Sequence, residues 1–214
     1  MSLDDIGMGN RKVLLVTLLV FTMLLSSFAF YGYQIVYSAN ILVDKEDAVL
    51  IIEPAETFKS LQDKLYSNDY VQDLVSFSFL ARIMDYDTSI KPGRYLLKKD
   101  MTNVDAIRML RIGQQQPVNI TFNNVRLIGD LGGKITSSIA LSEAQFNTAL
   151  DEFISSNEMG FNSQNIISMF IPDTYKVYYN ISGEQLVERM LAEYKRFWGR
   201  SEEHTSELQS LTNL

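Results

Sequence analysis

The sequence predicts an α+β protein that begins with a single helix long enough to cross a membrane. Residues 13–33 (VLLVTLLVFTMLLSSFAFYGY) contain no charged side chain. Segments at 48–52, 94–97 and 118–122 have the composition or alternation of strands, and apolar residues recur at helical spacing between and after them. A hydrophobic content of 46% indicates a folded chain. The net charge of −7 argues against a nucleic-acid surface, which needs clustered Lys and Arg.

The apolar run has the features of a membrane anchor. At about 1.5 Å of rise per residue it spans roughly 30 Å, the thickness of a hydrocarbon core. Arg11 and Lys12 precede the run, and the next basic residue is Lys45. The positive-inside rule therefore places residues 1–12 in the cytoplasm and the bulk of the chain outside the plasma membrane. Three tyrosines would lie at the outer interface: Tyr31, Tyr33 and Tyr37.

Two alternatives to a retained anchor exist. A cleaved signal peptide is one, although its apolar region is typically about 7 to 15 residues long and ends in small residues. The run ends instead in SFAFYGY, residues 27–33. A buried core helix is the other alternative, and the lack of a polar face argues against it.

A strand, two helices and a second strand are expected after the anchor. Residues 48–52 predict the first strand. Residues 56–84 predict two short amphipathic helices, with a break at Asn68 and Asp69. The turn residues Pro and Gly in IKPGRYLL, residues 90–97, then lead into a second extended segment.

A further helix and strand complete this part of the chain. The helix is expected to begin at Thr102, whose hydroxyl can accept a hydrogen bond from the amide of Asp105. Gly113 marks its end, and the polar stretch 114–117 indicates a boundary between modules. Residues 118–122 alternate between apolar and polar side chains, which is typical of a half-buried strand.

Two capping boxes predict further helix starts, because in each a Ser is followed three residues later by a Gln. These pairs are Ser142 with Gln145 and Ser182 with Gln185. The glycines of LIGDLGGK, residues 127–134, predict a turn. They do not form a phosphate loop, since no Lys-Ser or Lys-Thr pair follows them.

The residue inventory excludes several kinds of site. The chain has no cysteine, so it can form no disulfide, thiolate nucleophile or Cys-based metal site. It has one histidine, His204, near the C-terminus. We therefore expect no metal and no cofactor. Any acid–base chemistry would fall to carboxylates, tyrosines or lysines.

The segment MFIPDTYKVYY, residues 169–179, is the most distinctive part of the chain. Pro172 disfavours helix before it, and Asp173 and Thr174 can bond their own backbone in a turn. Tyr175 places a phenol beside the carboxylate. Aromatic rings next to a carboxylate suit sugars, whose C–H faces stack on rings while their hydroxyls take hydrogen bonds. Asp173, Thr174 and Tyr175 are therefore the candidate substrate-groove residues. The alternative is a core turn whose tyrosines pack inward.

Several motifs resemble those of the MltG-type (YceG-like) endolytic murein transglycosylases. FIPDTY, residues 170–175, resembles the F-x-P-D-T-Y signature of that family. IKPGRYLL is similar to its x-x-P-G-x-Y-x-L strand, and VNITF, residues 118–122, resembles the strand that opens its catalytic domain. The resemblance covers roughly residues 11–198. It implies a cytoplasmic tail (1–12), a transmembrane helix (13–33), a LysM-like βααβ subdomain (41–115) and a partial catalytic domain (116–198). Residues 199–214 follow the resemblance and are expected to be a non-native tail.

The chain departs from the family pattern in its expected carboxylates. The family often has an acidic residue and a glycine ahead of the P-D-T-Y segment, where this chain has Ile167 and Ser168. The family also often has P-E-G after the opening strand, where this chain has Asn-Asn-Val at residues 123–125. The family's catalytic glutamate lies in a later A-S-I-x-E-K-E-like helix, and nothing after Trp198 resembles it. Residues 200–214 (RSEEHTSELQSLTNL) are instead similar to a translated sequencing adapter. We therefore expect a fragment without the catalytic glutamate; the alternative is a natural polar tail.

The resemblance implies an enzyme anchored at the outer face of the bacterial inner (plasma) membrane. It would cleave MurNAc–GlcNAc bonds in nascent glycan strands with a single carboxyl group and leave 1,6-anhydro-MurNAc ends. The expected partners are peptidoglycan strands, the inner membrane and peptidoglycan synthases, and not nucleic acid. The fragment itself would be inactive and marginally stable. The alternative function is a non-catalytic, single-span envelope protein that binds glycan or cell-wall synthesis partners.

Overall fold

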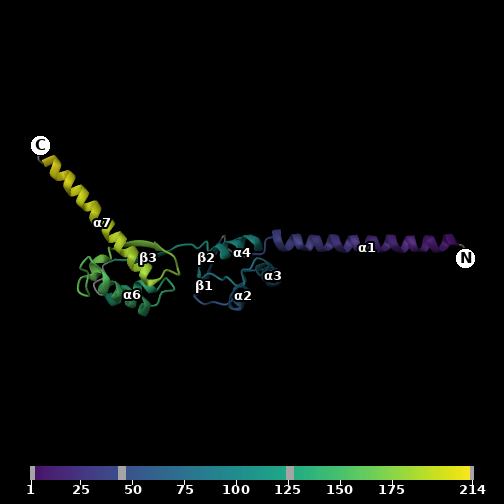
Figure 1. Ribbon diagram of the computed structural model, residues 1–214, viewed down its shortest axis with the longest axis horizontal. Coiled ribbons are helices and arrows are strands. Elements are labelled where there is room, and N and C mark those ends of the chain that lie inside the picture. Colours follow the sequence, from purple (N-terminus) through teal and green to yellow (C-terminus); the bar gives the residue numbers. More distant parts are fainter. Residues whose placement is uncertain (1–2, 43–46, 124–127, 213–214) are drawn as a thin grey trace. The chain divides into compact units, whose positions relative to one another are not determined.

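The computed structural model describes residues 3–42, 47–123 and 128–212 (Figure 1). It is a mixed helix-and-sheet structure, as predicted, and the chain divides into two compact units. The first unit consists of Met1–Val49, Thr57–Ile90 and Leu97–Ile112. The second unit consists of Leu50–Glu56, Lys91–Leu96 and Gly113–Leu214.

The first element is the long helix α1, Leu3–Tyr37. Its segment Arg11–Tyr37 has a mean hydropathy of 2.5 over its most apolar window, and none of that window is buried within the protein. The predicted apolar helix is therefore confirmed. It is long and apolar enough to cross a membrane, a property that membrane spans share with signal sequences.

The predicted strand–helix–helix–strand order is also confirmed. The hydroxyl of Thr57 accepts a hydrogen bond from the amide of Ser60 (3.2 Å) and caps the first of these helices. That helix stops at Asn68, and Asp69 then adopts a φ of 53°, a left-handed conformation that ends regular helix. The elements are β1 (Asp47–Ile52), α2 (Phe58–Ser67), α3 (Leu74–Ile83) and β2 (Gly93–Lys98), and β1 pairs with β2 in a two-stranded sheet.

Helix α4, Asn103–Ile112, begins where the sequence predicts. The hydroxyl of Thr102 accepts a hydrogen bond from the amide of Asp105 (3.1 Å) and donates one to its carboxylate (2.8 Å). Gly113 follows the helix with a φ of 82°, which a glycine adopts without strain. The core of the first unit is made by apolar side chains from its three short helices: Leu61, Leu65, Phe77, Leu80, Ala81, Ile107 and Leu110.

A buried polar cluster joins the end of α1 to α3 and α4, and we call Asn40, Ser76 and Asn103 the asparagine network. The side-chain amide of Asn103 donates to the carbonyl of Ile35 (3.1 Å) and to the hydroxyl of Ser76 (3.1 Å). Asn40 donates to the side-chain oxygen of Asn103 (2.7 Å). Asn103 is only 1% exposed. Buried polar groups need such partners, so the network holds these elements in one arrangement.

The second unit is built on a two-stranded antiparallel sheet covered by helices. In the described part of the chain it contains two strands and three α-helices after residue 116. The strands pair with Val118 opposite Val177 and Ile120 opposite Tyr175. Their apolar faces form the core with side chains from the helices, such as Leu131, Phe146 and Met190. The elements are β3 (Val118–Phe122), α5 (Ile128–Thr136), α6 (Glu143–Ser156), the 3-10 turn η1 (Ile166–Met169), β4 (Asp173–Val177) and α7 (Gly183–Thr212).

The turn predicted for LIGDLGGK is wrong, because residues 128–136 form helix α5. Leu131 and Ile135 lie four residues apart on one face and are fully buried. A β-carbon added at Gly132 would lie 3.2 Å from the Cγ of Glu143, so the helix packs closely at this position. A glycine costs a helix about 1 kcal/mol relative to alanine, whereas burial of one Leu or Ile side chain contributes about 1.5–3 kcal/mol. Tertiary burial therefore outweighs local propensity here.

Both predicted capping boxes are confirmed. The hydroxyl of Ser142 accepts from the amide of Gln145 (3.2 Å), and the Gln145 side chain accepts from the amide of Ser142 (2.9 Å). Ser182 and Gln185 make the same pair of bonds at 3.2 and 3.3 Å. Helix α7 continues from there to Thr212. The assignment of residues 199–214 to a non-native tail stays a prediction, and its residues 213 and 214 lie outside the described range.

Candidate functional site

The candidate site lies where the chain leaves η1 and enters β4. Asp173 and Thr174 are the first two residues of that strand, so the turn predicted for them is wrong. Pro172 precedes the strand, and the residues that follow it include the β-favouring Thr, Tyr and Val. Side chains alternate across a strand, so Thr174 points to solvent and Tyr175 into the core. Pairing with β3 fixes this register, with Thr121 opposite Thr174.

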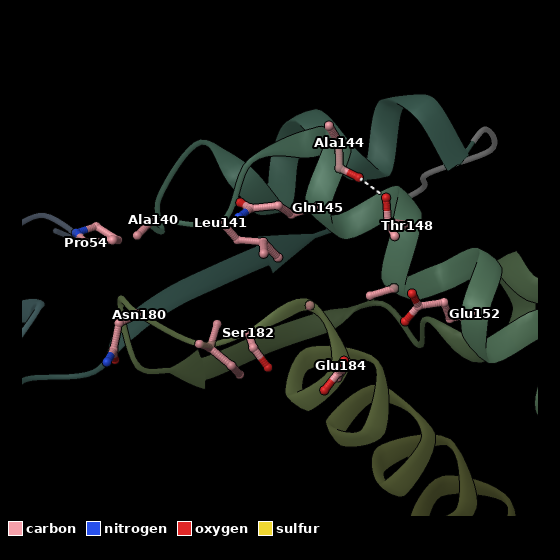
Figure 2. A pocket seen from close by; sticks show the side chains of 13 residues that line it. Pro54, Ala140, Leu141, Ala144, Gln145, Thr148, Glu152, Asn180, Ser182 and Glu184 are labelled. Carbon is pink, nitrogen blue, oxygen red and sulfur yellow. Dashed lines mark hydrogen bonds between the residues drawn. The ribbon is translucent and has the colours of Figure 1, made fainter.

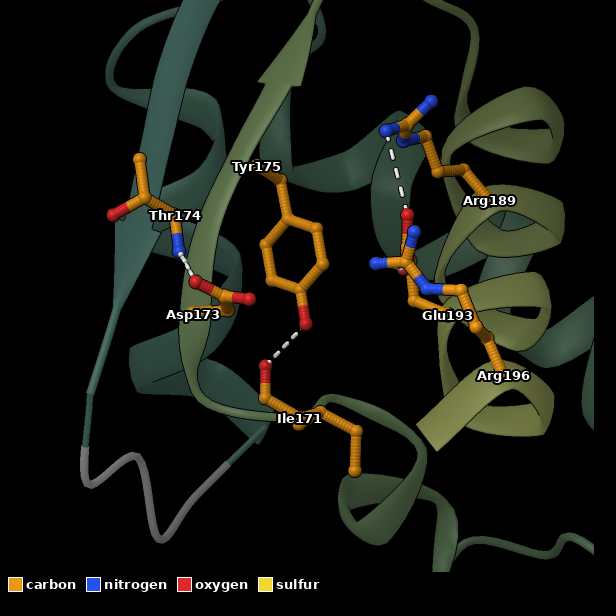
Figure 3. Close-up of polar contacts among 7 residues, drawn as sticks. All are labelled: Ile171, Asp173, Thr174, Tyr175, Arg189, Glu193 and Arg196. Carbon is orange, nitrogen blue, oxygen red and sulfur yellow. Dashed lines mark hydrogen bonds and ion pairs between the residues drawn. The ribbon is translucent and has the colours of Figure 1, made fainter. Parts of the chain in front are cut away.

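Tyr175 fixes the entry into the strand. Its ring is 5% exposed and stacks on that of Phe122, with centroids 5.0 Å apart and an interplanar angle of 20°. Its hydroxyl donates a hydrogen bond to the carbonyl of Ile171 (2.5 Å; Figure 3). Burial raises the pKa of Tyr175 to about 12, and the carboxylates of Asp173 and Glu193 act in the same direction. The phenol is therefore neutral at physiological pH and serves as a hydrogen-bond donor.

Asp173 and Thr174 present polar groups at the surface beside this buried ring. Both are exposed. The carboxylate of Asp173 accepts a hydrogen bond from the amide of Thr174 (2.7 Å). The hydroxyls of Thr174 and Thr121 lie 2.9 Å apart, across the two strands. The strand start thus offers a carboxylate and two hydroxyls that are fixed by backbone pairing.

Helix α7 adds three charged side chains opposite this strand start. Glu193 lies between two arginines, on the side of α7 that faces Tyr175 (Figure 3). One carboxylate oxygen is 3.4 Å from Arg189, and the other pairs with Arg196. The Glu193 side chain is only 14% exposed, whereas those of Arg189 and Arg196 are 46% and 65% exposed. The guanidinium groups lower the pKa of Tyr175 and so oppose the effect of the carboxylates.

We call Asp173, Thr174, Arg189 and Arg196 the β4–α7 surface. Guanidinium groups bind carboxylates and carbonyl oxygens, and a carboxylate accepts hydrogen bonds from hydroxyls. The surface can therefore bind a ligand that carries all of these groups. Within residues 11–42, 47–123 and 128–199, no group of three or more His, Asp or Glu side chains could hold a metal ion.

A separate cleft of about 520 Å³ lies between the starts of α6 and α7 (Figure 2). Its walls include Gln145 and Thr148 from α6 and Ser182 and Glu184 from the start of α7. Asp173, Thr174 and Tyr175 are not among the described residues that line it. The structure therefore separates the predicted site residues from this cleft.

Comparison with known protein families decides what kind of chain carries this surface. The model of the YceG-like family matches residues 50–213, which is most of the sequence. The chain belongs to the YceG-like family. The resemblance inferred from the sequence motifs is thus confirmed.

Two relatives of this YceG-like chain come from Streptococcus pneumoniae, one from serotype 2 strain D39 and one from strain R6. Both are named endolytic murein transglycosylase. Each is 24% identical to this chain over 213 residues, which cover 86% of this chain and 38% of the relative. The chain therefore spans about 38% of the length of the curated relatives it matches.

A crystal structure of a yceG-like protein from Listeria monocytogenes aligns with this YceG-like chain at a TM-score of 0.38. The two sequences are 16% identical, and the alignment covers 78% of this chain and 60% of the other.

The structure brings the three predicted residues of this YceG-like chain together on β4. Asp173 and Thr174 are exposed, but the Tyr175 ring is buried and its hydroxyl is bonded to Ile171. Tyr178, three residues further on, is 58% exposed. The segment thus has exposed polar side chains next to a tyrosine that packs inward. Contact of these residues with a substrate stays a prediction.

Sequence reasoning missed the charged residues of α7. Arg189 and Arg196 are 12 or more residues from the end of β4 in the sequence, so no local motif links them to Asp173. The only signal is the charge spacing on the helix, where Glu193 follows Arg189 by four residues and precedes Arg196 by three. Residues 124 and 125, where the family's P-E-G is missing, lie outside the described part of the chain.

Proposed function

We propose that the full-length protein is a membrane-anchored endolytic murein transglycosylase. One observation carries this proposal: the chain is a YceG-like protein that matches, over 86% of its length, relatives named endolytic murein transglycosylase. The proposed substrate is the nascent glycan strand of peptidoglycan, and the bond cleaved is that between MurNAc and GlcNAc.

The proposed reaction needs one carboxyl group that acts twice. The carboxylic acid first protonates the leaving glycosidic oxygen, and the resulting carboxylate then accepts the proton of the muramyl C6 hydroxyl. That hydroxyl closes a 1,6-anhydro ring, so the reaction consumes no water and needs no second carboxylate, unlike ordinary glycoside hydrolysis. We place this acid outside residues 1–198, because the motif that carries it in the family has no counterpart there.

In this proposal the β4–α7 surface binds substrate. The Asp173 carboxylate would accept hydrogen bonds from sugar hydroxyls, and Thr174 would exchange hydrogen bonds with the acetamido group. Arg189 and Arg196 would bind carboxylate or carbonyl oxygens of the stem peptides. Tyr175 is buried, so its role is to position Asp173 rather than to touch the ligand.

Helix α1 would be a retained anchor in the bacterial plasma membrane. Support comes from its apolar length and from Arg11 and Lys12 at its N-terminal side, which favour a cytoplasmic N-terminus. The successive elements β1, α2, α3 and β2 have the βααβ order proposed for a LysM-like subdomain, for which residues 41–115 remain the proposed bounds. Such a subdomain would bring the enzyme to glycan strands and to peptidoglycan synthases.

The test is a product analysis with the full-length protein. Purified protein in detergent is incubated with peptidoglycan, and the products are analysed by mass spectrometry. We expect 1,6-anhydro-muramyl ends, and a roughly 10- to 100-fold lower kcat/KM for Asp173→Asn, the size of effect that follows loss of about 1.4 to 2.7 kcal/mol of binding. Asp151→Asn, the same change at an exposed position on α6, is the matched control and should act like wild type.

Three outcomes would contradict parts of this proposal. Ordinary reducing ends would show hydrolysis instead of transglycosylation. Glycan binding without any cleavage would favour the non-catalytic, single-span envelope protein. Anhydro products made by the 214-residue chain itself would place the acid within it and refute its assignment to a segment beyond residue 198.

A further inference from the structure

We propose that one face of helix α3 lies in the outer interface of the membrane that α1 crosses. The face consists of Val75, Phe79 and Ile83, and we call it the α3 apolar face. This inference rests on the membrane anchoring in the proposed function and adds a second membrane contact to it. The occupant of the face is the lipid bilayer, at the level of the headgroups and the first acyl carbons.

The α3 apolar face is a single exposed side of an apolar helix. Its residues follow one another at intervals of four, which places them on one side of an α-helix. Their exposed fractions are 76%, 56% and 61%. The opposite side packs into the first unit through Phe77 and Leu80. An exposed apolar side of this kind on a folded unit marks a contact with another apolar surface.

The asparagine network sets the height of α3 relative to α1. One nitrogen atom of Asn103 is hydrogen-bonded to both the Ile35 carbonyl and the Ser76 hydroxyl, each at 3.1 Å. These two oxygens are therefore no more than about 6 Å apart. Ile35 lies two residues beyond Tyr33, the end of the uncharged run, which is about 3 Å of helix rise. The first turn of α3 thus lies at the level where the hydrocarbon core would end.

The chemistry around this level fits a membrane interface. Tyr31, Tyr33 and Tyr37 on α1 are 54% to 65% exposed, and tyrosine rings are enriched at this depth in membranes. The α3 sequence contains no acidic residue and one basic residue, Arg82, which is exposed and suits lipid phosphates.

The acidic residue at the start of α3 does not oppose such a contact. The carboxylate of Asp73 accepts hydrogen bonds from the amides of Val75 and Ser76, at 2.9 and 3.2 Å. It therefore serves as the helix cap and balances the positive end of the helix.

The position of α3 favours lipid over a protein partner. Helix α3 contacts α1 directly, and Figure 1 shows it beside the C-terminal end of that helix. Lipid around the last turns of α1 would therefore lie next to α3. A second copy of the chain would have to displace this lipid to cover the same face.

The absence of cysteine from the sequence allows a direct test with the full chain. Single cysteines are introduced as Val75→Cys and Phe79→Cys, labelled with the fluorophore NBD, and reconstituted into vesicles of phosphatidylethanolamine and phosphatidylglycerol. Ile112→Cys is the matched control, because Ile112 is 64% exposed at the far end of α4. That position is about 14 Å of helix rise from Asn103.

We expect lipids with a doxyl quencher at acyl carbon 5 to remove at least half of the fluorescence at positions 75 and 79. Aqueous iodide should quench these two labels at least fivefold less than the label at position 112. Circular dichroism of each labelled variant checks that its helix content is that of the unmodified chain.

A fourth label, at Leu24→Cys in the middle of the uncharged run, separates this proposal from the anchoring on which it rests. If lipid with doxyl at carbon 12 quenches position 24 but positions 75 and 79 behave like position 112, the α3 contact is refuted and the anchor stands. If position 24 is not quenched, the anchor itself is refuted. Labels at 75 and 79 that are shielded from iodide but not quenched by doxyl lipid would show a protein partner and overturn the proposal.

Discussion

The buried phenol of Tyr175 determines how Asp173 and Thr174 are presented. Its ring stacks on Phe122 and its hydroxyl is bonded to the carbonyl of Ile171, four residues earlier. This hydrogen bond closes a short loop from Ile171 to Tyr175, which contains the start of β4. The backbone of Asp173 is thereby fixed from one side by the ring and from the other by pairing with Phe122.

The pKa of Tyr175 gives a prediction on pH dependence. Its pKa is about 12 in the folded chain, because the ring is buried, and about 10 in an unfolded chain. The folded state therefore holds the proton more tightly, so the stabilisation is complete below pH 10 and is lost as the pH rises from 10 to 12. Tyr175→Phe should make the free energy of unfolding fall less steeply over that range, as measured by urea unfolding of the full chain in detergent.

Tyr178→Phe is the control for this experiment, because it removes the same hydroxyl from an exposed ring. At pH 7 we expect Tyr175→Phe to cost about 1 kcal/mol, the usual net value of one hydrogen bond, and Tyr178→Phe to cost less than about 0.5 kcal/mol. If the free energy of unfolding depends on pH equally in the two variants, the loss of stability between pH 10 and 12 is not due to Tyr175.

At the scale of elements, the close packing of α6 against the start of α7 depends on Gly183. A β-carbon at this position would lie 2.7 Å from the β-carbon of Ala149 and 3.0 Å from the carbonyl oxygen of Gln145. Gly183 and Ala149 also line the cleft between these helices. A glycine at the first residue of α7 is therefore required by packing, since its backbone has an ordinary conformation.

We predict that Gly183→Ala destabilises the chain by about 1–3 kcal/mol, because the two helices must move apart. Gly133→Ala is the matched control, since Gly133 lies in α5 with no atom within 4 Å of an added β-carbon. That change should stabilise the chain by about 0.5–1 kcal/mol through helix propensity. Thermal unfolding followed by circular dichroism measures both, and equal effects of the two substitutions would contradict the close approach.

Elements with strong local signals were predicted well. Thr102, Ser142 and Ser182 all cap helices at the expected positions. Helix α5 was missed, because its three glycines disfavour helix locally and its stability comes from burial of Leu131 and Ile135. Strand β4 was not predicted, for a similar reason. Asp173 and Thr174 have turn propensity, and only the pairing with β3 makes them a strand.

At the scale of the whole molecule, α1 is continuous with the first unit. Ala39 forms an antiparallel bridge with Thr102, and Asn40 belongs to the asparagine network. Proteolytic removal of α1 near these residues would act on a backbone that is held by contacts with Thr102 and Asn103. We therefore expect the helix to be retained and not removed as a signal peptide.

We predict that the intact chain has its N-terminus in the cytoplasm and its folded units outside. Single cysteines at Asn10→Cys and Glu158→Cys are tested in spheroplasts with a membrane-impermeant maleimide. Position 158 should react in intact spheroplasts, and position 10 only after lysis, because Arg11 and Lys12 hold the N-terminus inside. Mass spectrometry should find residues 1–38 still attached. A mature chain that begins after Tyr37, or the reverse labelling pattern, would refute the topology.

The sequence by itself determined the features that depend on neighbours a few residues apart. These include the apolar helix, the helix caps, the strand alternation of 118–122 and the motifs that identified the family. Tertiary structure decided the contacts between residues far apart in the chain. It made 128–136 a helix, placed Arg189 and Arg196 opposite Asp173, and set α3 at the level of Ile35. The physical reason is that local signals act through hydrogen bonds and rotamers within one or two turns. Burial and long-range pairing exist only once the chain has folded.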